Sequence, residues 1–432
     1  MSEMIEYIEL RFPDIFGQLK AMVVPCNPAA AVEDVARDPA MTKGTSCDGS
    51  SVAGLASVEA SDLRLEPDIS SLFELPFVSQ RTAAAMCFVR EKTAEKGEYF
   101  PLDTRGRLHQ AYEEYLPGDL RLEMKMEPEF HLTTSEGEPF DYAGYADTYP
   151  TSPGFDILLQ LSNALREIGI GVRVIHHEVG EAQQEIELSF DDARQVADNL
   201  LTFKNLARAI ARNQGVDVTF MPKPYEGSAG NGLHCHIQLW DGKKNLFGGE
   251  KDKLSDTAKS FVAGLLEHAP AITAIANPTV NSYKRLVPHH EAPVYICWGH
   301  MNRTVLVRVP MFRESQKAAV ELRSSDSMAN PYLLFTAIIA AGMDGVGRDL
   351  VPPDARSEDI FHMSGTKRKK LGIKTLPKGL GEALDALEKD KVVRAGIGEQ
   401  ISTAFMEAKR QECEDYWSQA VTDWEWRRYR DG

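Results

Sequence analysis

The stretch LRLEMKMEPEFHL, residues 120–132, alternates apolar and polar side chains along its length. Successive side chains of a β-strand point to opposite faces, so this pattern predicts a long strand with one apolar and one polar face. Glu127 and Glu129 share the polar face. The stretch therefore predicts a sheet that buries one side and presents carboxylates on the other.

Further strands and helices follow this stretch. Strand-like patterns occur at 172–179, 184–190, 232–240, 304–310 and 318–324. Helical patterns occur at 154–168, 191–213, 255–275, 330–347 and 396–421. Strands with helices between and around them are typical of an α+β fold, here with a curved antiparallel sheet and flanking helices.

The first hundred residues predict a separate small unit. Residues 4–25 alternate around a turn and predict a β-hairpin, and residues 42–57 form a loop rich in small side chains. Two more strands are expected at 73–78 and 83–90, before a charged, turn-like segment. Because 432 residues exceed one ordinary core, we expect two domains, 1–100 and 101–432.

Composition excludes several functional classes. The formal net charge of −16 disfavours binding to nucleic acid or to anionic membranes. The apolar run at 333–343 is too short to span a bilayer and predicts a buried helix. Six scattered cysteines without a CxxC pair are typical of reduced thiols. We therefore expect a cytoplasmic protein with no membrane and no nucleic-acid partner.

Polar residues at i, i+2 spacing recur on the predicted strands. His234 and His236 share one face, as do Glu321 and Arg323. Any single pair is equally typical of a solvated strand face. Several carboxylates with histidine in one domain instead suggest bound cations, because clustered carboxylates repel one another. Oxygen ligands with one imidazole suit Mg²⁺ or Mn²⁺.

Arginines accompany these carboxylates, at Arg285, Arg303, Arg308 and Arg323. Metal ions and guanidinium groups together are what phosphoryl transfer requires. The sequence has neither a GxxxxGK[ST] loop nor a GxGxxG turn after a strand, so a nucleotide would bind outside those two folds. The residues alone predict a metal-dependent phosphoryl-transfer site on an antiparallel sheet.

At these residues the chain resembles the glutamine synthetase family over nearly its whole length. The matching motifs are DGSS at 48–51, MEPEF at 126–130, HHEVGEAQQE at 176–185, GNGLHCH at 230–236, NPTVNSYKRLVP at 277–288, EAPVYICWG at 291–299 and ELRSSDSMANPYL at 321–333. The resemblance implies a small β-grasp N-terminal domain and a larger catalytic domain. It also implies a homo-oligomer, a dodecamer of two stacked hexamer rings with active sites between subunits.

The resemblance further implies a ligand set for two or three Mg²⁺ or Mn²⁺ ions per site. One ion would be held by Glu129, Glu178 and Glu185, and the other by Glu127, His234 and Glu321. His176 and His177 are expected to orient the end of their strand and not to bind metal. ATP would be a substrate.

The remaining site residues follow from the same motifs. Gly230, Arg285 and Arg323 would hold glutamate, and Arg303 and Arg308 would neutralise phosphate. His236 and Gln238 would join Arg308 at the nucleotide. Asp48 of the neighbouring subunit, with Ser51, Tyr145 and Glu178, would form the ammonium pocket, and Glu291 would lie on a loop that closes over glutamate. These are expectations from the resemblance.

The implied reaction joins ammonia to the γ-carboxylate of glutamate through γ-glutamyl phosphate, giving glutamine. Alternatives are a γ-glutamyl ligase for methylamine, ethanolamine or a polyamine, and a non-catalytic relative. Two positions depart from the family near the nucleotide, because Arg173 stands where Glu is usual and Ala319 where Arg is usual. We hypothesise that Arg173 supplies the positive charge missing at Ala319.

Overall fold

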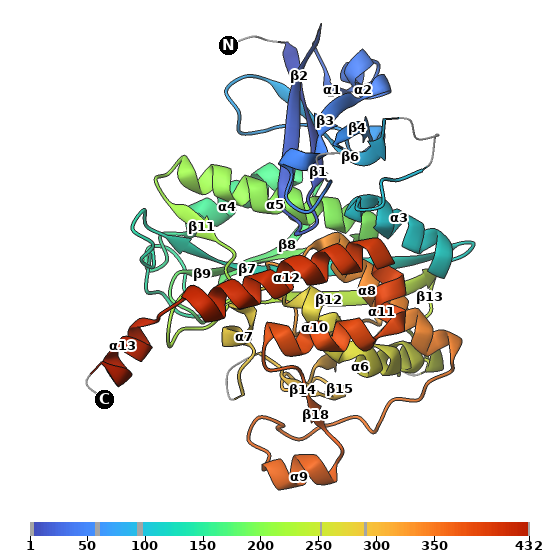
Figure 1. Ribbon diagram of the computed structural model, residues 1–432, viewed down its shortest axis with the longest axis vertical. Helices are drawn as coiled ribbons and strands as arrows, with labels where there is room; N and C mark the ends of the chain where they lie inside the picture. The colour runs from blue at the N-terminus through green and yellow to red at the C-terminus, as the bar shows by residue number, and fades with distance from the viewer. Residues whose placement is uncertain (1–3, 57–60, 93–97, 251–252, 289–291, 431–432) are drawn as a thin grey trace.

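The computed structural model describes residues 4–56, 61–92, 98–250, 253–288 and 292–430. A small N-terminal sheet lies at one end of a larger domain (Figure 1). Its strands are ordered β2-β1-β6-β4-β3, with β5 paired to β6. Their bounds are β1 Ile5–Pro13, β2 Leu19–Ala29, β3 Thr45–Asp48, β4 Asp62–Pro67, β5 Phe73–Glu74 and β6 Thr82–Glu91, with helices α1 Val32–Val35 and α2 Pro39–Lys43.

The predicted N-terminal hairpin is confirmed, because β1 and β2 pair antiparallel around residues 14–18. The predicted strands at 73–78 and 83–90 correspond to β5 and β6. The segment 42–57, expected to be a loop, contains the strand β3, and β4 was not predicted. The signal for β4 was the pair Leu63 and Leu65, whose alternate side chains are buried.

The large domain is built on a ten-stranded sheet ordered β15-β16-β17-β12-β7-β9-β8, with β10 and β11 paired to β7 and β13 paired to β12. Among the described residues, the strand pairings of this sheet are antiparallel except that of β15 with β16. The bounds are β7 Leu120–Thr133, β8 Val172–His177, β9 Gln183–Leu188, β10 Asp191–Asp192, β11 Asp217–Thr219, β12 Leu233–Asp241, β13 Lys244–Asn245, β15 Trp298–His300, β16 Val307–Val309 and β17 Val320–Leu322; β14 Tyr295–Ile296 pairs separately with β18 Lys374–Thr375.

Strand β7 runs through the middle of this sheet and separates core from cavity. Its apolar side chains are fully buried, at Leu122, Met124, Met126, Phe130 and Leu132. The intervening residues Lys125, Glu127 and Glu129 project from the opposite face. Burial of the apolar row fixes the register, because a slip by one residue would place the carboxylates in the core.

Helices surround the sheet, and all five predicted helices are present. The bounds are α3 Thr104–Tyr115, α4 Phe155–Glu167, α5 Ala193–Arg212, α6 Asp256–Ala276, α7 Ser282–Arg285, α8 Pro331–Gly347, α9 Gly365–Lys370, α10 Leu380–Lys389, α11 Lys391–Ile397, α12 Glu399–Gln419 and α13 Asp423–Tyr429. Helix α3 was not predicted, because its buried face includes Arg105 and Arg107 besides Leu108 and Tyr112. Within the described residues, no helix combines the length and hydropathy of a membrane span.

Helix α8 contains the apolar run at 333–343 and packs against α6. Asn330 caps it by accepting hydrogen bonds from the backbone N–H groups of Tyr332 and Leu333. The two helix backbones are in contact, since a Cβ on Gly264 would lie 2.1 Å from the carbonyl oxygen of Ala341. Glycine is therefore required at this crossing.

Candidate active site

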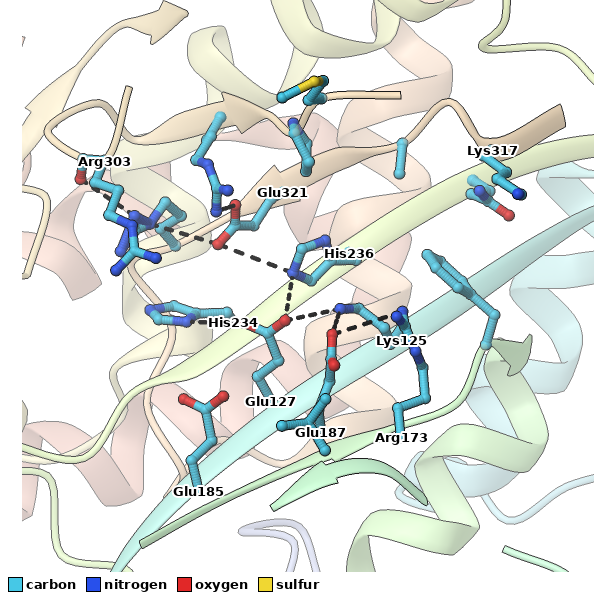
Figure 2. Close-up of a pocket in the computed structure, with 18 of the residues that line it drawn as sticks. Lys125, Glu127, Arg173, Glu185, Glu187, His234, His236, Arg303, Lys317 and Glu321 are labelled. Atoms are coloured by element: carbon cyan, nitrogen blue, oxygen red, sulfur yellow. Dashed lines mark hydrogen bonds and ion pairs between the residues drawn. The ribbon is translucent and has the colours of Figure 1, made fainter. Parts of the chain in front are cut away.

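A cavity of about 800 Å³ opens on the polar face of the large sheet. It is lined by carboxylates and imidazoles from strands β7, β8, β9, β12 and β17 and from the turn after β8: Glu127, Glu178, Glu185, Glu187, Glu321, His176, His234 and His236 (Figure 2). A second cavity of about 420 Å³ adds Glu129, Gly230 and Arg285 and shares Glu178, His234 and Arg323 with the first. The two cavities thus form one continuous polar site.

Strand register brings these residues together. Glu127 lies opposite His234 across the β7–β12 pair, and Glu129 lies opposite Glu185 across the β7–β9 pair. His236 lies opposite Glu321 in the next pair. Opposed residues of neighbouring strands have their Cβ atoms about 5 Å apart, so the i, i+2 pairs seen in sequence stack into a two-dimensional cluster.

Glu127 is held at both of its oxygens. Its Oε1 lies 2.8 Å from His236 Nε2 and 2.8 Å from Lys125 Nζ, and its Oε2 lies 3.3 Å from His234 Nδ1. Burial alone would raise the pKa of Glu127, but its hydrogen bonds to the two histidines hold that pKa well below the usual range. Glu127 is therefore ionised.

Glu321 is also matched by cations of the protein. It is buried, and Arg308 donates to its Oε2 at 2.6 Å while Arg323 Nε lies 3.5 Å from its Oε1. Burial opposes ionisation, yet the charges of His236 and Arg323 lower the pKa of Glu321. The carboxylates at this end of the cavity are thus charged and paired.

The other end of the site carries an excess of negative charge. Burial, with the charges of Glu129 and Glu185, raises the pKa of Glu178 to about 7. Burial likewise raises the pKa of Glu129, although Gly232 N–H and Gln183 Nε2 donate to it at 2.7 and 3.0 Å. The neighbouring imidazoles are His234, 4.0 Å from Glu129, and His176, which lies 3.5 Å from Glu185 and has its pKa raised to about 9, first by that contact.

These donors fit divalent cations. Three groups place their ligand atoms within 4.8 Å of one another: Glu127 with His236 and Glu321, Glu127 with Glu185 and His234, and His176 with Glu178 and Glu185. Carboxylates with imidazole suit Mg²⁺ or Mn²⁺, and a cation would relieve the repulsion that raises the pKa of Glu178. The groups include His176 and His236 and omit Glu129, so the ligand sets expected from the motifs stay predictions.

The second cavity is shaped around Arg285. This side chain is buried and donates from NH1 to the carbonyl oxygen of Ser324 at 2.8 Å. A Cβ on Gly230 would lie 2.4 Å from the oxygen of Pro222 and 3.1 Å from Arg285 Cγ, so a larger residue would collide with the Pro222 backbone and crowd the arginine. Arg323 reaches both cavities. The arrangement suits an anionic substrate beside the carboxylate cluster.

Asp48 and Ser51 lie elsewhere, in the N-terminal domain. Asp48 accepts hydrogen bonds from the hydroxyls of Ser50 and Ser51 at 2.7 and 2.8 Å, and these bonds lower its pKa. Neither Asp48 nor Ser51 lines the two cavities that the described residues form. Tyr145 does line the larger cavity, with its ring 5.3 Å from that of His176. A single chain therefore does not assemble the expected ammonium pocket.

The other expected residues are distributed as follows. Arg303 and Gln238 line the larger cavity, and Gln238 donates to the oxygen of Ala318 at 3.1 Å. Glu291 lies outside the described residues. His177 is buried and bonds to Asp141 at 2.9 Å, a contact that orients the strand end as expected. His176 instead faces the cavity.

Two contributors escaped sequence reasoning. Lys125 lies two residues before Glu127 on the same face of β7, and that spacing was the available signal. Gln183 donates to Glu129 and also to the carbonyl oxygen of Gly230 at 3.1 Å, which ties together two residues that line the second cavity. No short-range pattern marks this role of Gln183, because the two residues to which it donates here are more than forty residues away in sequence.

Comparison with protein families explains this geometry. A model described as the β-grasp domain of glutamine synthetase matches residues 4–92, and one described as the glutamine synthetase catalytic domain matches residues 101–429. The chain belongs to the glutamine synthetase family. The predicted family and fold class are thereby confirmed.

Members of this family with similar sequences come from archaea. Glutamine synthetase of Pyrococcus abyssi is 41% identical over 98% of this chain and 96% of its own. That of Methanococcus maripaludis is 39% identical over the same shares. This chain is therefore similar to them over nearly its full length.

Solved structures of the family include two kinds of enzyme. GmaS, a γ-glutamylmethylamide synthetase, in complex with ADP gives a TM-score of 0.88 at 32% identity, over 99% of this chain and 97% of that one. Glutamine synthetase of Plasmodium falciparum gives 0.84 at 23% identity, over 98% and 96%, a likeness in fold. The chain is a ligase of the glutamine synthetase family, which uses ATP and divalent metals.

Proposed function

We propose that this protein is a glutamate–ammonia ligase, which forms glutamine from glutamate, ammonium and ATP. The observation that carries the proposal is the buried cluster of carboxylates and imidazoles in one cavity, adjoining a second cavity built around Arg285. The archaeal glutamine synthetases at about 40% identity support ammonium as the nitrogen donor.

In this proposal each of the two cavities holds a different substrate. The smaller cavity holds glutamate, with Arg285 and Arg323 opposite its carboxylates. The larger holds ATP, with Arg303 and Arg308 placed to neutralise the γ-phosphoryl group as it moves to the γ-carboxylate. Mg²⁺ or Mn²⁺ held by the carboxylates would supply Lewis-acid charge to the phosphates. Phosphorylation is needed because a carboxylate is a poor electrophile.

The second step needs a group that binds ammonium and removes a proton. Asp48 is our candidate, because its carboxylate is exposed at the surface of the N-terminal domain, where it can bind a cation and accept a proton from it. Since Asp48 does not line its own chain's cavities, the proposal requires a neighbouring subunit to supply it. We therefore propose a homo-oligomer, a dodecamer of two hexamer rings, with Tyr145 and Glu178 completing the pocket.

A second candidate is ligation of methylamine to glutamate. It is favoured by the likeness to GmaS, which extends over 99% of this chain. The two reactions share glutamate and ATP and differ at the nucleophile pocket. Retention of Asp48, Ser51 and Tyr145 favours ammonium, because a larger amine needs space that these side chains would fill.

A coupled assay of ADP release tests the proposal. With glutamate, ATP and Mg²⁺ or Mn²⁺, we expect turnover with ammonium and a far lower kcat/KM with methylamine, ethanolamine or a polyamine, with glutamine identified as product. A higher kcat/KM with methylamine would assign the protein to the second reaction. Absence of turnover with every amine, despite nucleotide binding, would contradict ligase activity altogether.

A further inference from the structure

Lys125 is a buried lysine inside the catalytic cavity. Its side chain is 6% exposed, yet it lines the cavity beside Glu127 and His236. The ammonium group of the Lys125 side chain donates to Glu127 at 2.8 Å and to Glu187. Figure 2 shows it between these two carboxylates, on the side of Glu127 away from Glu185. It therefore bridges strands β7 and β9 at one end of the site.

The contacts of the Lys125 ammonium group resemble those of a bound metal ion. It shares Glu127 Oε1 with His236 Nε2, which lies 2.8 Å from the same oxygen. Without Lys125, two carboxylates and an imidazole would face one point, which is the kind of donor set that binds a divalent ion. An ammonium has three N–H donors. Two are used by Glu127 and Glu187, so one is left for a ligand in the cavity.

Charge balance separates this end of the site from the other. Here Glu127, Glu187 and Glu321 form ion pairs with Lys125, Arg308 and Arg323. Arg173 adds a further cation 3.7 Å from Glu187. In the described part of the chain, no lysine or arginine forms an ion pair with Glu129, Glu178 or Glu185. Divalent ions are therefore needed mainly at Glu129, Glu178 and Glu185.

We propose that Lys125 is a built-in cation that takes the place of one divalent ion at the nucleotide end of the site. Its third N–H binds a phosphate oxygen of ATP, and Glu127 and Glu187 hold the ammonium in place. Lys125 is thus a positioning residue for the nucleotide, and the site binds about two divalent ions and not three. This inference rests on the proposed function, because it takes ATP as the ligand.

A purely structural ion pair is the competing interpretation. Two observations argue against it. A pair that only joined β7 to β9 would need no further donor, whereas Lys125 lines the cavity and has a third N–H beyond those given to Glu127 and Glu187. In addition, Arg173 already provides Glu187 with a partner from the cavity edge. The number of divalent ions bound per subunit, with and without the charge of Lys125, distinguishes the two interpretations.

The experiment compares the assembled wild-type protein with Lys125→Met, which keeps the length of the side chain and removes its charge. Calorimetry measures the number of Mn²⁺ ions bound and their affinity, and then the affinity for the non-hydrolysable ATP analogue AMP-PNP. We expect about two Mn²⁺ per subunit in the wild type and an additional ion in Lys125→Met. We also expect the analogue to bind about tenfold more weakly at limiting Mn²⁺ and to recover at high Mn²⁺.

Two further variants make the result specific. Lys125→Arg keeps the charge and should bind the wild-type number of ions, which also provides a test if Lys125→Met fails to fold. Lys204→Met removes a buried lysine of helix α5 outside the cavities and should leave ion number and analogue affinity unchanged. An additional ion in Lys125→Arg would overturn the inference, because charge would then not decide the count.

Failure of this inference is distinguishable from failure of the proposed function. If the wild type ligates ammonium but Lys125→Met binds the same number of ions and the analogue equally well, Lys125 is a structural ion pair and the inference is wrong. If the wild type ligates no amine but Lys125→Met gains an ion and loses analogue affinity, the role of Lys125 holds and the proposed reaction does not.

Discussion

The cavity on the large sheet and the junction of helices α6, α8 and α10 both place histidine among carboxylates. At the junction, His268 Nδ1 lies 2.7 Å from Asp390 and its Nε2 lies 3.0 Å from Asp344. Arg348 donates to Asp344 at 2.7 Å. Arg348 also donates to Glu267 at 2.9 Å, so each of the three carboxylates has a cationic partner, and both ring nitrogens of His268 are used.

The catalytic cavity uses the same residue types without that balance. In the described part of the chain, Glu178 and Glu185 pair with His176 and Glu129 pairs with His234, none of them with a lysine or arginine, and the pKa of Glu178 rises to about 7. Residue identity therefore does not distinguish a structural cluster from a functional one. The distinction lies in whether the protein's own cations satisfy the carboxylates, and a deficit indicates a place for an external cation.

The largest expected effect comes from neutralising one carboxylate of the unbalanced group. Glu185→Gln should lower kcat/KM by at least about 10³-fold, because a metal ligand contributes several kcal/mol to the transition state. In metal-free buffer the same variant should match the wild type in stability to within about 1 kcal/mol, since removal of the repulsion with Glu178 offsets the lost contact with His176. ADP release and denaturant unfolding in EDTA measure the two effects.

The control for Glu185→Gln is Asp344→Asn, which neutralises a carboxylate of the balanced junction. It should keep activity within about twofold and lose stability, because His268 and Arg348 lose a partner. Equal losses of stability in EDTA for the two variants would show that the two clusters do not differ as we describe.

A smaller effect is expected from His268→Ala, and it depends on pH. Burial would lower the pKa of His268, but hydrogen bonds to Asp390 and Asp344 raise it above its ordinary value of 6.5. The protonated form therefore stabilises the fold fully below pH 6.5, and this contribution is lost as pH rises through the higher folded-state pKa. His268→Ala should cost about 2 kcal/mol at pH 6 and less at pH 9.

Urea unfolding of wild type and His268→Ala across this range measures the difference between them. A constant difference from pH 6 to pH 9 would mean that the imidazole is not charged at the junction. His300→Ala is the matched control, because burial lowers the pKa of that histidine and gives it no stabilising charge to lose.

The smallest effect is expected from Arg173→Ala. The Arg173 side chain is 51% exposed and pairs with Glu187 at 3.7 Å at the cavity edge. We expect the KM for ATP to rise about two- to fivefold with kcat nearly unchanged, as for an exposed cation. Steady-state kinetics measure the KM for ATP. Lys317→Ala, which removes another cation that lines the larger cavity, is the control (Figure 2). An unchanged KM would remove the hypothesis that Arg173 compensates for Ala319.

Sequence predicted the parts of the site that lie on single strands. Alternation placed Glu127 with Glu129, and His234 with His236, on shared faces, because strand geometry has a fixed period of two. It did not give the pairing of β7 with β9, on which the contact of Lys125 with Glu187 depends. Register across distant strands follows from the packing of the whole core, which no local pattern encodes.

The same limit applies to the fold. Long, strongly periodic segments such as α5 and β7 were predicted nearly to their ends. Two-residue strands such as β10 and β13 were not, because they exist through their partners and not through their own side chains. Helix α3 was not predicted because Arg105 lies on its buried face. Its long-range ion pair with Asp198 makes burial possible, but in the sequence the position has the polar residue type of an exposed face.

The exposed position of Asp48 has a genetic consequence if the proposed reaction is right. A chain lacking the Asp48 carboxylate would be defective only toward its neighbour's centre, and a chain lacking Glu185 only at its own. Two inactive alleles expressed together would then rebuild some intact centres at mixed boundaries. Complementation between such alleles would show that each active centre is formed by two neighbouring chains.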